Sequence, residues 1–321
     1  MSELRATRTS LSDPSTVAGV ATGVCVSGVL MACLMRPEIG RYLTEAIALT
    51  CALAAGGIAL FLVRIPEQLP PTAALRTLTV RLAVVAFAAA LLTLPFAIMD
   101  VSGDGLRGLG DGLARSVALR GGDYQSIVAR SAGLVLLVGA LRLHRFSRPA
   151  LLLSAVLIVG SYLLMGHVRT HGPRAAVLAA TLAHVGAASA WFGGLVALGF
   201  GLRQARDDTR TSGRLLAAFA RTMSVVLALL LAAGAGLAVL YLPSPGALVH
   251  SAYGEVLLVK LAVVATALVL SAANHSRLVP AAETGNMTAV RVLRVNIAAE
   301  QLLLATVFVV TEILMRQNPG G

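Results

Sequence analysis

The side chains best suited to chemistry in this sequence are histidines that gather around one polar connector. His167 and His171 lie in the connector 167–174, and His184 follows in the next apolar stretch. A spacing of four residues places His167 and His171 on the same side of a helical turn. Neutral imidazole binds transition-metal ions such as copper and zinc. The pattern predicts a metal site near this connector, while a hydrogen bond to a neighbouring helix is the alternative role for His184.

Methionines supply a second type of soft ligand. Met165 stands two residues before His167, and His250 occupies another connector. Further methionines end apolar stretches: Met31, Met35, Met99 and Met315. Thioether sulfur favours Cu(I) and imidazole suits copper in either oxidation state, whereas Mg²⁺ and Ca²⁺ require oxygen ligands. The Cys-rich and HExxH patterns of zinc sites are missing. Methionine in membrane helices also serves packing alone.

The donor set therefore favours a copper ion, as Cu(I) or Cu(II), and zinc stays open as the alternative. We expect His167, His171 and His184 to be the first ligands, and His250 and Met165 to be auxiliary ligands. Because a metal ligand must offer a lone pair, the imidazoles have to be neutral when copper binds.

A second group of residues places charges inside apolar stretches, where charge is costly and often functional. Lys260 is the only lysine in the chain, and Glu255, five residues earlier, is its candidate partner. Glu300 lies in the last apolar stretch, with Arg221 as its candidate partner. Two interpretations remain open, namely an internal polar scaffold that joins helices and a relay for protons or ions.

The composition defines the environment in which these residues must work. The chain is 57% hydrophobic and 13% charged, with a mean hydropathy of +0.83, whereas soluble domains are roughly a quarter charged. This predicts an integral membrane protein. The net charge of +11 lies mostly in short connectors, where it sets topology. Nucleotide-binding and nucleophile–base motifs are missing, so we expect no catalytic residues and no enzyme.

The apolar stretches predict an all-α, polytopic helical bundle, because helices satisfy their own backbone hydrogen bonds in lipid. A span needs about twenty apolar residues. Nine candidate spans meet this requirement: 16–35, 43–63, 78–99, 126–143, 149–166, 175–202, 215–241, 254–273 and 295–315. The first span is a candidate for a peripheral helix, outside a core formed by the other eight. The predicted parts are a tail (1–15), N-terminal helices (16–143), a membrane core (144–316) and a C-terminal tail (317–321).

The arginines predict the orientation of these spans. Connectors on the side of the N-terminus carry fifteen arginines, and those on the other side carry eight. The richer side faces the cytoplasm, so the N-terminus is predicted inside and the C-terminus outside. The connectors 167–174 and 242–253 then face outward. The long connector 100–125 also faces outward, either as a surface helix or lid or as a solvated linker.

Several motifs, taken in order, resemble the CopD copper-resistance family of inner-membrane proteins. The resemblance covers about 145–315 and rests on Gly166-His167, the run from His184 to Trp191-Phe192-Gly193-Gly194-Leu195, Phe219-Ala220-Arg221, Tyr253-Gly254-Glu255-Val256-Leu257-Leu258-Val259-Lys260, and Asn274 with Arg277 and Pro280. Glu255 departs from the family, which usually has a basic or polar residue there. Trp191 and the glycines after it are expected to serve helix packing. The N-terminal layout is similar to the actinobacterial branch.

The resemblance implies a multi-pass protein of the bacterial cytoplasmic membrane that moves copper inward from an outward-facing His/Met site. It implies a periplasmic CopC-like protein as a partner, or a CtaG-like partner in oxidase assembly. Two alternatives stay open. One is a copper-delivery or assembly factor without transport, and the other is a haem-binding electron-transfer protein that uses the histidines as axial ligands.

Overall fold

The computed structural model describes residues 36–64, 72–142, 148–165, 168, 172–205 and 209–317. Every regular element in these ranges is helical. Seven helices are long and apolar enough to cross a membrane, and a shorter apolar helix runs over Arg148–Leu164. These eight correspond to eight of the nine predicted spans; the span at 16–35 lies outside the described residues. The prediction of an all-α, polytopic membrane protein is confirmed, and the predicted orientation remains a prediction.

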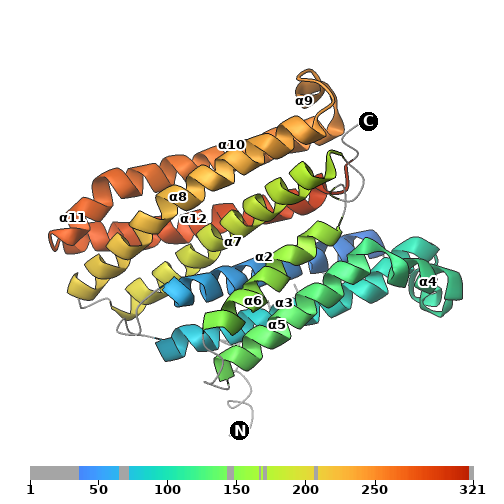
Figure 1. The fold of residues 1–321 in the computed structure, drawn as a ribbon, viewed down its shortest axis with the longest axis horizontal. Coiled ribbons are helices and arrows are strands. Elements are labelled where there is room, and N and C mark those ends of the chain that lie inside the picture. The colour runs from blue at the N-terminus through green and yellow to red at the C-terminus, as the bar shows by residue number, and fades with distance from the viewer. Residues whose placement is uncertain are drawn as a thin grey trace, which may run out of the picture. The chain divides into compact units, whose positions relative to one another are not determined.

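Figure 1 shows the helices in chain order. They are α2 (Pro37–Arg64), α3 (Thr72–Ser102), η1 (Gly105–Gly110), α4 (Gly112–Arg120), α5 (Gly122–Arg142), α6 (Arg148–Gly160), η2 (Ser161–Leu164), α7 (Arg174–Gln204), α8 (Thr209–Tyr241), α9 (Ala247–His250), α10 (Ala252–Ala273), η4 (Asn274–Leu278), α11 (Val279–Glu283) and α12 (Met287–Leu314). The segment η4 is π-helical, and the 3₁₀-helical segments are η1 and η2.

Side-chain caps fix where two of the long helices begin. The hydroxyl of Ser251 accepts a hydrogen bond from the backbone N–H of Gly254 at the start of α10. The side chain of Asn286 accepts from the N–H groups of Thr288 and Ala289 at the start of α12. The first N–H groups of a helix have no partner within it. These caps therefore satisfy N–H groups that the first turns of α10 and α12 would otherwise leave without a partner.

The chain divides into two compact units, of which the first contains residues 1–44 and 92–119. Within it, Arg41 forms an ion pair with Asp100 at 3.1 Å, and the hydroxyl of Thr93 donates to that of Thr44 at 3.2 Å. The connector 100–125 folds into η1, α4 and the start of α5. It is therefore helical over much of its length, as the surface-helix interpretation predicts, and Leu113 of α4 is 74% exposed.

The second unit contains residues 45–91 and 120–321, and its core is built around α7. In this unit α7 contacts α6, α8 and α12, while α5 packs on α6 and α10 packs on α12. The indole of Trp191 is 1% exposed, and the rings of Phe192 and Phe308 meet edge to face with centroids 5.0 Å apart. Trp191 therefore serves packing, as predicted. The outer faces of α8 and α10 are largely open, as suits helices in contact with lipid.

Backbone-to-backbone contact joins α7 to α2 within this unit. A Cβ atom added to Gly193 would lie 2.5 Å from the Cα of Gly57, and one added to Gly57 would lie 1.8 Å from the carbonyl oxygen of Ser189. The hydroxyl of Ser189 also donates to the carbonyl of Leu53 at 2.8 Å. Small residues permit such close approach of membrane helices. The predicted role of Gly193 in helix packing is confirmed.

The contact predicts that Gly193→Ala destabilises the protein, because its new methyl group meets backbone atoms that cannot rotate away. We expect a loss of at least about 1–3 kcal/mol, measured as a lower Tm of the detergent-solubilised protein. Gly236→Ala on α8 is the matched control, since a Cβ there meets nothing within 4 Å. Its Tm should stay the same or rise, because alanine favours helix more than glycine does. Equal Tm values for the two variants would contradict the close contact.

Candidate functional site

The predicted copper ligands lie on several elements of the second unit. His184 stands on α7 and is half-buried, His250 ends α9 and is exposed, and Met165 follows η2 and is buried. His167 and His171 lie outside the described residues. Among the residues that the structure does describe, no group of three His, Cys, Asp or Glu side chains gathers closely enough to hold a metal. The predicted convergence of histidines therefore remains a prediction.

The ring of His184 is held by α8. Its Nδ1 lies 3.1 Å from the carbonyl oxygen of Leu230. Because a carbonyl can only accept, this contact places a proton on Nδ1, and a neutral ring then carries its lone pair on Nε2. Histidines that bind metals commonly donate their other N–H to such a carbonyl. A Cβ on Gly234 would lie 2.9 Å from Cε1 of His184, so the glycine makes room for the ring.

Lys260 of α10 acts on His184 through its charge, since it lies within electrostatic range of the ring. The described residues give Lys260 no ion pair, and the predicted pairing with Glu255 is not found among them. Five residues along an α-helix correspond to a rotation of about 140° between the two side chains. Lys260 and Glu255 therefore point to different sides of α10, and Glu255 is exposed.

Glu300 of α12 has amide partners among the described residues, and its pairing with Arg221 remains a prediction. Its Oε1 accepts a hydrogen bond from Nδ2 of Asn274 at 2.5 Å, and Oδ1 of Asn274 accepts from Nδ2 of Asn296 at 2.7 Å. Gln301 donates to the carbonyl of Leu195 on α7 at 2.9 Å. The side chain of Arg221 lies outside the described atoms. These bonds tie α12 to η4 and to α7, so this region does contain a polar scaffold.

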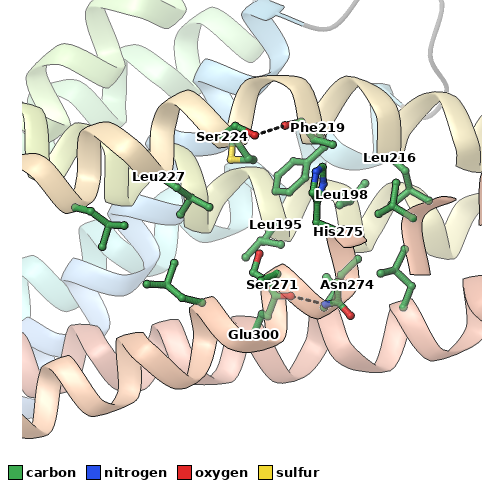
Figure 2. Close-up of a pocket in the computed structure, with 18 residues that line it drawn as sticks. Leu195, Leu198, Leu216, Phe219, Ser224, Leu227, Ser271, Asn274, His275 and Glu300 are labelled. Carbon is green, nitrogen blue, oxygen red and sulfur yellow. Dashed lines mark hydrogen bonds between the residues drawn. The ribbon is translucent and has the colours of Figure 1, made fainter. Parts of the chain in front are cut away.

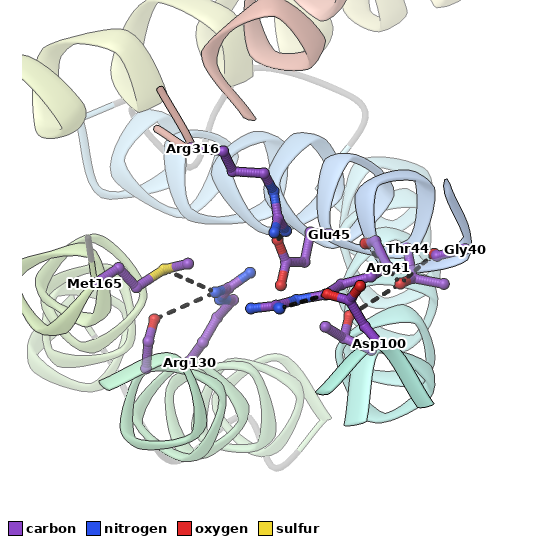
Figure 3. A network of polar contacts seen from close by, with 10 residues as sticks. Gly40, Arg41, Thr44, Glu45, Asp100, Arg130, Met165 and Arg316 are labelled. Carbon is purple, nitrogen blue, oxygen red and sulfur yellow. Dashed lines mark hydrogen bonds and ion pairs between the residues drawn. The ribbon is translucent and has the colours of Figure 1, made fainter. Parts of the chain in front are cut away.

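The sequence reasoning missed a buried ion cluster in the second unit, made of Glu45, Arg130, Glu312 and Arg316. Glu45, Arg130 and Glu312 are no more than 5% exposed. Arg316 forms an ion pair with Glu45, and the side chain of Glu312 is hydrogen-bonded to that of Glu45. Figure 3 shows Glu45 and Arg316 beside Arg130. A hydrogen bond between two carboxyl groups requires a proton on one of them, and the two arginines offset the charge of the other, which lowers the cost of placing the cluster in an apolar setting.

Arg130 connects this cluster to the predicted ligand Met165. Its Nη2 donates to the sulfur of Met165 at 3.5 Å and to the hydroxyl of Ser126 at 3.2 Å, as Figure 3 shows. The guanidinium also lies 5.0 Å from the centroid of the Tyr162 ring, a cation–π distance. The sulfur of Met165 is thus engaged by a fixed cation. The sequence did carry a signal for this group, because an arginine inside the predicted span 126–143 demands a partner.

Together these features define a polytopic α-helical membrane protein with a buried ion cluster and a histidine whose Nε2 is available as a ligand. Residues 213–314 match the family described as CopD, Copper resistance protein D. The matched segment, about a third of the chain, runs from within α8 to the end of α12, and it supports the predicted resemblance to CopD over these residues. It contains Lys260 and Glu300 but not His184. Comparisons with curated proteins and with solved structures found no match.

The ion cluster predicts a large cost for removing one of its carboxylates. Glu45→Gln leaves Arg316 without its ion pair, and we expect a loss approaching the roughly 3–5 kcal/mol of a broken buried pair, seen as a lower Tm. Asp100→Asn is the matched control, because the Arg41–Asp100 pair is more exposed to solvent and exposed pairs contribute about 1 kcal/mol or less. Equal losses in the two variants would contradict a structural role for the cluster.

Proposed function

We propose that this copper-resistance membrane protein binds copper through His184 and moves it inward across the bacterial cytoplasmic membrane. The CopD assignment supports copper as the substrate. The observation that carries the proposal is the His184 ring, whose Nδ1 is engaged by the Leu230 carbonyl on α8. An imidazole so oriented presents Nε2 as a nitrogen donor from within a membrane helix, the geometry that metal-binding histidines use.

One imidazole does not complete a copper site, so the proposal requires further ligands. The connector leading into α7 carries His167 and His171, which we propose as the partners of His184, with His250 and Met165 as auxiliary ligands. Nitrogen and sulfur donors favour copper over Mg²⁺ and Ca²⁺. The outward orientation predicted for this connector is consistent with capture of copper on the extracytoplasmic side. A CopC-like protein there, or a CtaG-like assembly partner, is the proposed source or receiver of the ion.

The proposal predicts that His184→Ala loses copper while the fold is kept. We expect copper affinity to fall at least about tenfold, measured by metal analysis and titration of purified protein, with Tm close to that of the wild type. Leu182→Ala is the control, because Leu182 lies two residues away on α7 and is 44% exposed. Equal copper content in wild type and His184→Ala would remove His184 from the site.

Copper uptake into proteoliposomes then separates transport from delivery. The wild type should load copper into the vesicles, and His184→Ala should not. If the wild type binds copper in detergent but its vesicles stay unloaded, transport is excluded and a delivery or assembly role is supported. A Soret absorbance band in the purified protein would instead support the haem-binding alternative.

Lys260 supplies a second, electrostatic prediction for the same site. A positive charge within range of the ring opposes the binding of a cation there. Lys260→Met removes the charge at similar length, so copper affinity should rise several-fold, whereas Lys260→Arg should leave it near the wild-type value. Isothermal titration of the purified variants with copper measures the difference. Weaker binding by Lys260→Met would show that Lys260 supports the metal instead of repelling it.

A further inference from the structure

A cavity of about 400 Å³ lies among α7, α8, α10 and α12 within the second unit. Its walls are mostly apolar, and its polar groups other than Ser224 lie together where α10 and η4 meet α12, as Figure 2 shows. These groups are Ser271, Asn274, His275 and Glu300. Of the predicted copper ligands that the structure describes, His184, His250 and Met165, none lines it.

The carboxyl group of Glu300 is the unusual member of this set. Glu300 is 1% exposed. Its Oε1 accepts from Asn274 and Ser271 also bonds to the carboxyl, but its buried Oε2 has no hydrogen-bond partner among the described residues. A carboxylate so deeply buried is costly unless a cation pairs with it. Among the side chains that the structure describes, no cation pairs with it, and a proton on the carboxyl group would remove the need for one.

The groups that face Glu300 favour a proton over a metal ion. From α10 and η4 they are the hydroxyl of Ser271, the amide of Asn274 and, as the one other titratable side chain in the cavity wall, His275. Among the described side chains, the walls from α7 and α8 are apolar apart from Ser224, and on α12 Asn296 is bonded to Asn274. One carboxyl oxygen with two neutral donors does not form the multidentate oxygen cage that hard metal ions require. A proton needs only the carboxyl itself.

Local backbone geometry supports the same assignment. Residues Asn274–Leu278 form a π-helical turn between α10 and α11, and such turns occur frequently at functional sites. This turn carries Asn274, whose amide contacts Glu300 on one side and Asn296 on the other. The wider turn thus positions the donor that holds one carboxyl oxygen and leaves the other oxygen beside the cavity.

We propose that Glu300 is a proton-binding carboxyl of the membrane domain and that its proton enters and leaves through this cavity. The step is a simple ionisation, in which the O–H bond at the carboxyl breaks and the proton passes to water, and the reverse reloads it. Within the proposed copper transporter, which this role presupposes, Glu300 is the group that couples proton movement to copper movement.

Labelling with dicyclohexylcarbodiimide tests the proton site directly. This apolar reagent adds across a protonated carboxyl group, and the adduct rearranges to a stable N-acylurea that retains every atom of the reagent. Peptide mass spectrometry of the labelled full-length protein should find the adduct on Glu300. Above the pH at which Glu300 ionises, labelling should fall about tenfold per pH unit. The variant Glu300→Gln should lose the adduct.

Glu312 provides the matched control on the same helix. It is 3% exposed, its carboxyl group is hydrogen-bonded to that of Glu45, and it does not line the cavity. The reagent therefore has no route to it through the cavity, and it should stay unlabelled. The variant Glu312→Gln should keep full labelling of Glu300. The proposal is overturned if Glu300 stays unlabelled at every pH, if its labelling does not depend on pH, or if Glu312 is labelled equally.

Coupling is tested separately in proteoliposomes with an imposed pH difference. Glu300→Gln should bind copper in detergent like the wild type, while its copper uptake should no longer respond to the pH difference. If uptake responds as in the wild type, the coupling role is overturned. If Glu300 is labelled but the wild type binds no copper, the proposed copper function fails and the proton site stands. If copper binds and Glu300 is unlabelled, the proton site fails alone.

Discussion

The lack of water in the hydrocarbon region is the constraint on which this structure depends. Every backbone polar group there must be bonded within the protein, and every charge must be paired, neutralised or placed next to a cavity. The helices meet the first requirement by themselves. The second requirement determines which side chains face one another. Glu45 and Arg316 pair inside the cluster, whereas Glu300 contacts neutral amides. The buried ionisable groups thus fall into two kinds. Some are paired with an opposite charge and serve the structure, and others have neutral partners and are proposed to exchange a proton.

Helix α7 carries both the close contact with α2 and the proposed ligand His184. Around residues 189–194 it is pressed against α2 by contacts too close for side chains, and this contact fixes its position. Two turns earlier along the helix, His184 meets the carbonyl of Leu230 on α8. A rigid helix carries the orientation of one part to the next, so the glycine contact helps to determine where the imidazole points. The packing of α7 against α2 and the orientation of the proposed ligand His184 are thus coupled through this one helix.

The sequence predicted the helices well and the pairs of buried polar groups poorly, for one physical reason. Hydropathy reports whether a segment is buried in lipid, and it placed eight of the nine spans on described helices. It reports nothing about how each helix is rotated. Lys260 and Glu255 are near in sequence but point to different sides of α10. Glu300 bonds to Asn274 of a π-turn that apolar periodicity does not reveal. Arg130 was overlooked although it lies inside a span, and the convergence of His167 and His171 with His184 remains a prediction.

Glu300 and Glu312 show how surroundings give one residue type two roles on one helix. Both belong to α12, twelve residues apart, and both are almost fully buried. Glu312 shares a hydrogen bond with Glu45 beside Arg130 and Arg316, so it is part of a set of groups that hold one another. Glu300 has amide and hydroxyl neighbours and lines a cavity. The cavity offers a route by which a proton on Glu300 can exchange. Glu312 does not line that cavity and its carboxyl group is bonded within the cluster, so it is suited to a structural role.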